Sequence, residues 1–361
     1  MKIKEPSFQD NPEFIYKNRG EHRKGNNAIV WSNPATDLKK RYKYTGKRRL
    51  GYKVFYRSEY TPKLNKFSWK KENPVPLEEV TFIQNLFWME GMAPRVLDVI
   101  TFESSEKLYY AQVTELLEED EQGPWTDETM AKARKFMEER SIMMVSMDHG
   151  PFHCYKDKFV DFGDFRILDK NKYEEGLKER VIKETSYGNR MYQTIPDLKI
   201  EGVRKFKERL PVLKFDEENF IGKTALVFGC NAGVTCQEIA KRGAARVIGI
   251  DFPNVAKAAQ ELAFYLGYNN IEFYGCGSDY EKIKELTGLS QFDIVTYFAC
   301  FQMGWPDFLK DLVKETFFLE GHKQQEKKTH MKLLKGIFLK VKYLGQITDD
   351  GSRPVYKCTY E

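Results

Sequence analysis

The sequence has few features that would place the protein in a membrane or an oxidising compartment. No uninterrupted apolar run approaches the about 18 residues that a membrane-spanning helix needs, so no membrane span is expected. The first residues, Met1-Lys2-Ile3-Lys4-Glu5-Pro6, lack the apolar core of a secretory signal. The six cysteines lie scattered, with no Cys-x-x-Cys pair, at positions 154, 230, 236, 276, 300 and 358. Scattered cysteines indicate reduced thiols rather than a disulfide frame or a zinc site, so we expect a cytoplasmic protein without a metal centre.

The composition is that of a globular protein with an uneven charge distribution. Of the 361 residues, 31% are charged and 41% are hydrophobic, and the length favours two domains. Between Lys17 and Lys71, 17 Lys or Arg residues stand against three acids, whereas residues 72–361 carry an excess of acids. A basic segment on an acidic chain favours a polyanionic partner or a phosphate-bearing ligand, although a solvated lysine-rich surface explains it equally well.

Changes in the residue pattern divide the chain into four parts. Residues 1–40 form an irregular basic arm with few apolar residues. Residues 41–170 indicate an α+β domain, and the charged residues 171–215 a basic helical linker. From 216 to 361 the pattern becomes strand–helix alternation, which is typical of a parallel sheet in an α/β domain. In the α+β domain we expect strands over 50–56, 95–102 and 108–116, helices over 77–89 and 127–140, and a hairpin-like stretch over 143–165.

A glycine turn between a strand and a helix is the most informative feature of the C-terminal part. The apolar run Thr224–Phe228 leads into Gly229-Cys230-Asn231-Ala232-Gly233 and then into a predicted helix, 234–242. Such a turn brings the backbone against a ligand and directs N–H groups toward it. A second strand ends in Asp251, 22 residues after Gly229, the spacing at which a carboxylate reaches the ribose hydroxyls of an adenosine ligand. The turn residues, Asp251 and the adjacent Phe252 are the expected cofactor-binding residues.

Two further strands complete the predicted site. Residues 270–274 lead into small residues that leave room for an adenine ring, where Ser278 or Asp279 can accept the exocyclic amine. Residues 292–297 form a fourth strand followed by Phe298, which we add to the cofactor-binding set. The tail, 337–344 and 355–360, indicates an antiparallel strand pair that closes the sheet.

This succession of motifs resembles the Rossmann-like S-adenosylmethionine (SAM)-dependent methyltransferases over roughly residues 216–361. The resemblance implies an enzyme that transfers a methyl group, SAM as cofactor, and a mostly parallel seven-stranded sheet. Two departures stand out: Val227 occupies the place of an acid that helps to hold the amino end of the methionine part, and Asn231 replaces the middle glycine. Another anchor, such as Glu238, would then be needed. The alternative is a Rossmann-like domain that has lost its ligand.

Catalytic groups are expected beyond the fifth strand, because ligands of open α/β sheets lie at the carboxyl ends of the strands. Glu320 and His322 follow that predicted strand, and a histidine with a pKa of about 6.5 can accept a proton from a hydroxyl or an amine. A loop acid and a surface histidine are the alternative. The motif Asn/Asp-Pro-Pro-Tyr/Phe is absent after Tyr297, which argues against an exocyclic base amine as acceptor.

The N-terminal α+β domain resembles the protein-kinase-like fold of small-molecule and lipopolysaccharide kinases. In that resemblance Lys53 is the phosphate-pairing lysine, Glu79 its helix partner, Asp148 the catalytic aspartate and Asp161 the metal-binding aspartate of Asp-Phe-Gly. ATP with Mg²⁺ would then bind this domain. The departures are His153 in place of a metal-binding Asn, no clear glycine-rich loop before Lys53, and little helical lobe after Asp161. An active kinase, a remnant that binds nucleotide or acceptor, and a fold without ligand all remain open.

Kinase-like and methyltransferase domains in one chain resemble enzymes that modify surface glycans, which implies a saccharide, phosphosugar or other small-molecule acceptor. Three alternatives stay open. The first is a nucleic-acid (RNA) methyltransferase that uses the basic arm and linker, which we do not favour; the second is a bifunctional kinase and methyltransferase; the third is a binding protein without catalysis. The sequence leaves the methylated atom and the oligomeric state undetermined.

Overall fold

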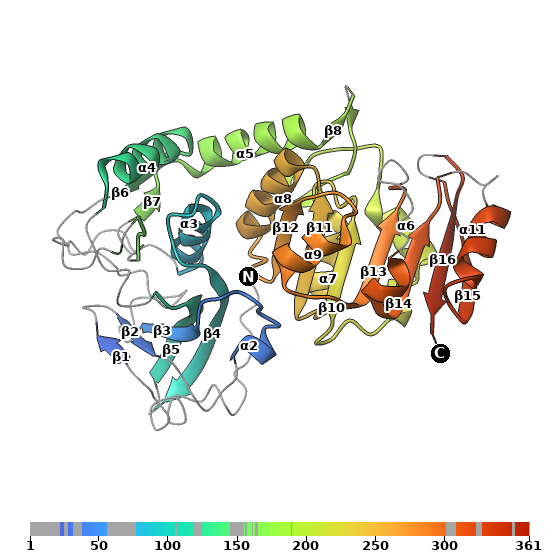
Figure 1. The fold of residues 1–361 in the computed structure, drawn as a ribbon. Coiled ribbons are helices and arrows are strands. Elements are labelled where there is room, and N and C mark those ends of the chain that lie inside the picture. The colour runs from blue at the N-terminus through green and yellow to red at the C-terminus, as the bar shows by residue number, and fades with distance from the viewer. Residues whose placement is uncertain are drawn as a thin grey trace. The chain divides into compact units, whose positions relative to one another are not determined.

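The computed structural model describes residues 22–24, 28–31, 38–55, 77–104, 107–117, 125–144, 155, 157–160, 162, 165–188, 190–300, 308–322, 327–348 and 351–360. The chain divides into two compact units, Met1–Gly176 and Leu177–Glu361, each with its own main sheet (Figure 1). The division falls inside helix α5 (Lys170–Thr185), within the segment expected to be a linker. No helix in the described ranges is long and apolar enough to cross a membrane.

The first unit is built on a five-stranded antiparallel sheet in the order β1-β2-β3-β5-β4. Its strands are β1 (His22–Lys24), β2 (Ala28–Trp31), β3 (Leu50–Phe55), β4 (Val96–Ser104) and β5 (Lys107–Glu115). A short helix, α2 (Leu38–Arg41), precedes β3, and helix α3 (Leu77–Met89) lies between β3 and β4 in the chain, at the predicted bounds.

Helix α3 is fixed by an aromatic cluster and by one buried amide. The ring of Phe87 makes edge contacts, at centroid distances of 5.1 to 5.3 Å, with Phe136, Phe159, Phe162 and Phe165. Asn85 accepts a hydrogen bond from the Val96 amide at 2.8 Å and donates one to the Val96 carbonyl at 3.0 Å, which ties α3 to β4. Helix α4 (Asp127–Glu139) and the antiparallel pair β6 (Ile142–Met144) and β7 (Phe165–Ile167) complete the described part of this unit.

The second unit holds a seven-stranded sheet in the order β12-β11-β10-β13-β14-β16-β15. Its strands are β10 (Thr224–Phe228), β11 (Arg246–Asp251), β12 (Ile271–Gly275), β13 (Phe292–Phe298), β14 (Val313–Glu320), β15 (Lys340–Ile347) and β16 (Arg353–Thr359). Neighbours are parallel except β16, which runs antiparallel to both β14 and β15. This confirms the predicted α/β class with a mostly parallel seven-stranded sheet.

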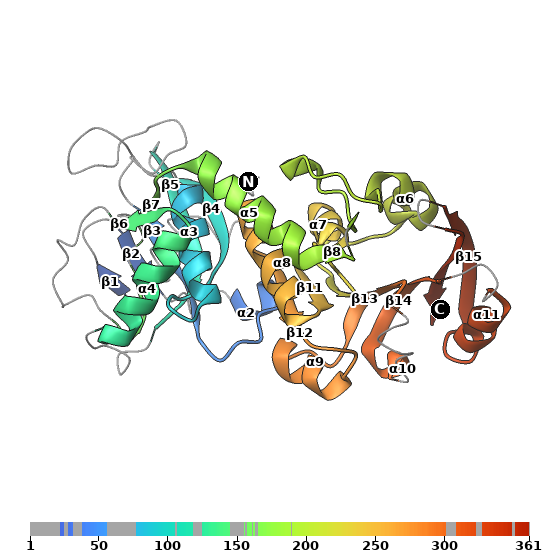
Figure 2. The same ribbon diagram turned by 90° about the horizontal axis from the view of Figure 1, so that it is seen from above.

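Helices cover both faces of this sheet (Figure 2). Helices α6 (Phe206–Leu213), α7 (Val234–Lys241) and α8 (Pro253–Tyr265) share one apolar cluster, and α9 (Tyr280–Thr287), α10 (Leu309–Leu312) and α11 (Lys327–Lys335) share another. Within β10, Ala225 and Val227 enter the first cluster, whereas Leu226 and Phe228 enter the second. Side chains of a strand alternate between the faces, so a strand covered on both sides becomes a continuous apolar run, as β10 is.

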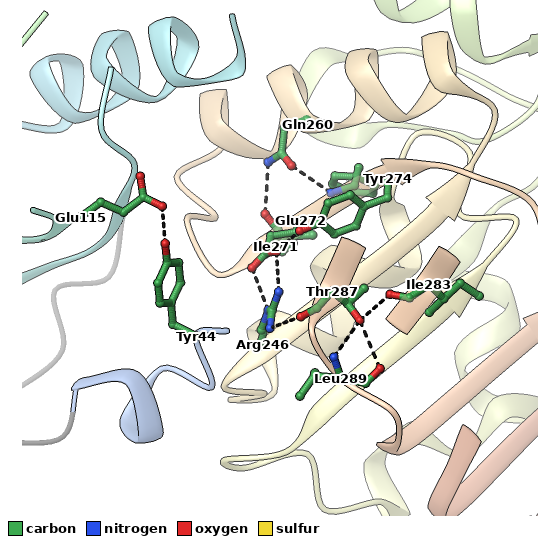
Figure 3. Close-up of polar contacts among 11 residues, drawn as sticks. Tyr44, Glu115, Arg246, Gln260, Ile271, Glu272, Tyr274, Ile283, Thr287 and Leu289 are labelled. Atoms are coloured by element: carbon green, nitrogen blue, oxygen red, sulfur yellow. Dashed lines mark hydrogen bonds and ion pairs between the residues drawn. The ribbon is translucent and has the colours of Figure 1, made fainter. Parts of the chain in front are cut away.

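A buried ion pair joins Arg246, the first residue of β11, to Glu272 of β12 (Figure 3). The guanidinium of Arg246 donates to both carboxylate oxygens of Glu272, at 2.8 and 2.7 Å, and to the Thr287 carbonyl at 3.0 Å. The Tyr274 hydroxyl donates to the same carboxylate at 2.6 Å. Nearby, Gln260 of α8 donates to the Ile271 carbonyl and accepts from the backbone of β12. These contacts hold β11 and β12 together. The carboxyl ends of these two strands carry part of the candidate cofactor site.

Candidate cofactor site

The glycine turn connects β10 to α7 through a left-handed backbone. Gly229, Asn231 and Gly233 have φ values of 60°, 50° and 81°. A Cβ on Gly229 would lie 2.2 Å from the Cys300 sulfur, and one on Gly233 would lie 2.5 Å from the Phe273 ring. Glycine is therefore required at both ends of the turn by space as well as by conformation. The side chains of Cys230 and Ala232 are buried beneath the turn, so these two residues can offer a ligand only their backbone.

Asp251 lies beside this turn, because β10 and β11 are parallel neighbours with Phe228 opposite Ile250. One carboxylate oxygen accepts from the Asn231 amide at 2.8 Å and the other from the Phe252 amide at 2.8 Å. Burial raises the pKa of Asp251, and the two amide bonds partly oppose that rise. A carboxylate offers about four acceptor positions, so two remain for the hydroxyls of a ribose.

Exposed residues follow the carboxyl ends of β11 and β12. The Phe252 side chain is 68% exposed although it is a large apolar residue. Gly277 is exposed, and a Cβ there would meet no atom within 4 Å. Asp279 caps α9 by accepting from the Lys282 amide at 3.1 Å, while Ser278 is partly buried beside it. The adenine contacts predicted for Ser278 and Asp279 remain predictions.

Glu320 ends β14 inside a cluster of arginines. Its carboxylate, which is 0% exposed, pairs with Arg204 at 2.5 Å, with Arg209, and with Arg353 at 3.6 Å. Burial acts to raise the pKa of Glu320, but Arg209 and Arg204 outweigh it and the pKa is lowered. A carboxylate held ionised in this way is a poor proton acceptor at neutral pH, so its surroundings favour a structural role over the predicted catalytic one.

Two further predicted residues lie at the same edge. Phe298, opposite Glu320 in the β13–β14 pairing, is 9% exposed and packs in the core with the Arg209 guanidinium 5.4 Å from its ring. His322 follows β14 by two residues and is partly buried. Its predicted role as a base stays a prediction. Within the described residues, no group of three or more His, Cys, Asp or Glu side chains is arranged to hold a metal ion.

Residues 186–188 and 190–204, which we call the cap segment, contact the glycine turn and were expected only as part of a linker. The segment contains the strand pair β8 (Ser186–Tyr187) and β9 (Arg190–Met191) and the 3-10 turn η5 (Pro196–Leu198). Gln193 donates to the Cys230 carbonyl at 3.3 Å, and Asn231 donates to the Thr185 carbonyl, just before the segment, at 2.9 Å. Gln193 was not predicted from the sequence, because the segment has no periodicity that would indicate a contact with the turn.

The alternative anchor named from the sequence is already engaged. Glu238, on α7, pairs with Arg242 one helical turn later. Val227 is 1% exposed in the middle of the sheet. Val227 is therefore an apolar core residue at the position where the resemblance implied an acid, and Glu238 is engaged within its own helix.

In the first unit, Lys53 and Glu79 make separate contacts. The Lys53 ammonium donates to the Val160 carbonyl at 3.0 Å. Glu79 accepts from the Ile167 amide at 3.0 Å and pairs with Lys170 at 3.0 Å. The other two kinase-like positions, Asp148 and Asp161, lie outside the described residues.

No protein-family model matches the sequence, and no curated protein matches it. Among solved structures, the bifunctional kinase-methyltransferase WbdD matches at 18% identity and a TM-score of 0.41, over 51% of this chain and 46% of that chain. A ribosomal protein L11 methylase from Lactobacillus delbrueckii subsp. bulgaricus matches at 14% identity and a TM-score of 0.37, over 44% of this chain and 82% of that one. The chain thus spans about half the length of WbdD, and likenesses of this extent concern the fold alone. The second unit has a mostly parallel seven-stranded sheet with a glycine turn after β10, which is a Rossmann-like α/β fold.

Proposed function

We propose that this protein is a SAM-dependent methyltransferase. The observation that carries the proposal is the direct hydrogen bond between Asp251 and the glycine turn at the Asn231 amide. It lies where the strand order reverses, since the chain runs from β10 outward to β12 and then crosses to β13. In open α/β sheets this reversal opens the crevice in which nucleotide-like ligands bind.

The side chains at this crevice fit the adenosine half of SAM. Asp251 has acceptor positions left for two ribose hydroxyls beyond its two amide bonds. The exposed ring of Phe252 offers a flat apolar surface for a base, and the space beside Gly277 accommodates one. The turn needs glycine at Gly229 and Gly233. Its backbone is the proposed contact for the methionine part of SAM.

SAM, when bound, supplies a methyl group already activated on a sulfonium, so the protein's task is mainly alignment of the acceptor. His322 is the proposed base where the acceptor must lose a proton, because an imidazole nitrogen can accept a proton from a hydroxyl or an amine. Glu320 serves instead to hold the arginines of the cap segment and α6 against β14.

The proposed acceptor is a saccharide or a phosphosugar held by the first unit. The support is the kinase-like order of its described elements: an antiparallel five-stranded sheet with helix α3 between the third and fourth strands. The contact of Lys53 with the Val160 carbonyl brings this lysine to the residue before the predicted metal-binding Asp161, which favours nucleotide binding there as a second activity. Strongly salt-dependent binding of generic RNA would favour a nucleic-acid acceptor instead.

Calorimetric titration of the full chain with SAM and with its demethylated product, S-adenosylhomocysteine, tests the proposal. The wild type should bind both, and Asp251→Ala should bind each at least tenfold more weakly, because hydrogen bonds to a charged acceptor contribute about 1.5–3 kcal/mol each. Asp197→Ala, which removes an exposed aspartate of η5, is the matched control and should leave both affinities unchanged. No heat and no thermal shift with either ligand in the wild type would refute the proposal.

A further inference from the structure

Gln193, in the cap segment, is a buried amide with one end satisfied and the other without a partner. The residue is 7% exposed. Its Nε2 donates to the Cys230 carbonyl at 3.3 Å, while its Oε1 is buried and makes no hydrogen bond. Because a carbonyl oxygen only accepts, the nitrogen end of the amide must face Cys230, and the oxygen is left as a free acceptor beside the glycine turn.

The backbone around Gln193 fixes this placement. Gln193 forms a parallel bridge with Arg204, and Thr194 donates its amide to the Arg204 carbonyl at 3.0 Å. A Cβ on Gly202 would lie 2.4 Å from the Gln193 carbonyl carbon, so glycine is required for the close approach of these two stretches. These backbone contacts hold the stretch that carries Gln193 beside the stretch around Arg204.

A second unsatisfied acceptor belongs to the turn itself. Asn231 donates its side-chain nitrogen to the Thr185 carbonyl at 2.9 Å, and its Oδ1 is buried without a hydrogen bond. A buried acceptor without a donor is destabilising, so two such acceptors at this turn point to a missing hydrogen-bond donor. A ligand that brings hydrogen-bond donors to this place supplies one.

The methionine part of SAM carries one strong donor group, its α-ammonium, with three N–H bonds. Residues 229–233 include no acid to receive it, Val227 is an apolar core residue, Glu238 is paired with Arg242, and Asp251 is assigned to the ribose. Building on the proposed function, we propose that Gln193 Oε1 and Asn231 Oδ1 accept hydrogen bonds from the α-ammonium of SAM. Two neutral amides then replace the carboxylate that related methyltransferase turns use.

The test compares ligands that differ only in the amino-acid part. S-adenosylhomocysteine has the ammonium, its deaminated thioether analogue lacks only that group, and 5′-methylthioadenosine lacks the whole amino-acid part. Titrations of the full chain use the wild type, Gln193→Met, Asn231→Gly and the control Gln346→Met, which alters a glutamine of β15 bonded to Ser352. Asn231→Gly removes the amide without strain, because glycine adopts the positive φ of this position readily.

In the wild type, removal of the ammonium from the ligand should weaken binding about tenfold or more. Gln193→Met should lose about the same factor for S-adenosylhomocysteine, and Asn231→Gly a smaller one, while both keep the wild-type affinity for the deaminated analogue and for 5′-methylthioadenosine. Gln346→Met should match the wild type throughout. If Gln193→Met does not fold, the wild type and Asn231→Gly with the three ligands still decide the matter.

Two results would overturn the inference while leaving the methyltransferase proposal intact. One is a wild type that binds S-adenosylhomocysteine and its deaminated analogue equally well. The other is a set of variants that lose all three ligands by the same factor or lose none. A wild type that binds none of the three ligands would refute the proposed function itself, and with it this inference.

Discussion

The backbone amide of Asn231 donates to the Asp251 carboxylate at 2.8 Å, so the acid that closes β11 holds the turn that closes β10. Both oxygens of the Asp251 carboxylate keep acceptor positions for a ligand. This one contact links the conformation of the turn to the position of the group proposed to bind ribose. A substitution at Asp251 is therefore expected to change both the conformation of the turn and the binding of the ribose.

Ligand affinity should fall in acid solution because of Asp251. Burial raises its pKa above the ordinary 3.8, and the ionised carboxylate accepts hydrogen bonds from ribose hydroxyls more strongly than the protonated acid does. Affinity for S-adenosylhomocysteine should therefore be full above this raised pKa and fall as the pH drops through it, beginning at a higher pH than for an exposed aspartate. Titrations across the acid range check this, and Asp251→Asn should show a weaker but flat profile. A wild-type profile as flat as that of the variant would contradict the assignment.

The buried charges of Arg246 and Glu272 should stabilise β11 and β12 only when both are present. Glu272→Gln leaves a buried guanidinium without its counter-charge and should cost about 3–5 kcal/mol of unfolding free energy. The double variant Arg246→Met with Glu272→Met should cost clearly less, because no buried charge then remains unmatched. Urea unfolding measures both. Equal losses for the single and double variants would show that packing, rather than charge, dominates here.

Substitution of Glu320 should lower the stability of the fold rather than the rate of the chemical step. Its lowered pKa means that its contribution is present above the ordinary value of 4.5 and is lost as the pH falls toward the folded-state pKa. Glu320→Gln should unfold more easily than the wild type at neutral pH, and the difference should shrink in acid. By contrast, His322→Ala should keep its melting temperature and SAM affinity and lose turnover. A stable but inactive Glu320→Gln would restore the carboxylate to the mechanism.

A side chain at Gly229 should destabilise the fold through two effects that can be measured separately. Gly229→Ala places a Cβ against the Cys300 sulfur and also puts alanine at a φ of 60°, which alone costs about 1–2 kcal/mol. Removing the sulfur as well, in Gly229→Ala with Cys300→Ala, should recover the steric part and leave the conformational part. Melting curves of the single and double variants, with Cys300→Ala as control, measure the difference. No recovery in the double variant would place the clash elsewhere.

The second unit was largely predictable because its strands are buried on both faces. Strand β10 spans the apolar run 224–228, and β11 has the predicted bounds 246–251, with Asp251 at its end. The role of Asp251 in ligand binding stays a prediction. The helix bounds of α3 were equally clear from its apolar spacing. In each case the signal is local, because periodicity and turn chemistry lie within a few residues.

The contacts that complete the site are not local, and the sequence did not reveal them. The partners of Glu320, Arg204 and Arg209, lie 116 and 111 residues earlier in the chain. Gln193 sits in a segment of two-residue strands, too short for any pattern to register. A polar residue in such a segment resembles any surface residue until the fold brings it against the Cys230 carbonyl.

A structure of the full chain determined with S-adenosylhomocysteine tests the central claim most directly. We predict density for the ligand along residues 229–233, with both ribose hydroxyls within hydrogen-bond distance of the Asp251 carboxylate and the base beside Phe252. A crevice filled by protein side chains, or a ligand bound away from Asp251, would contradict the account.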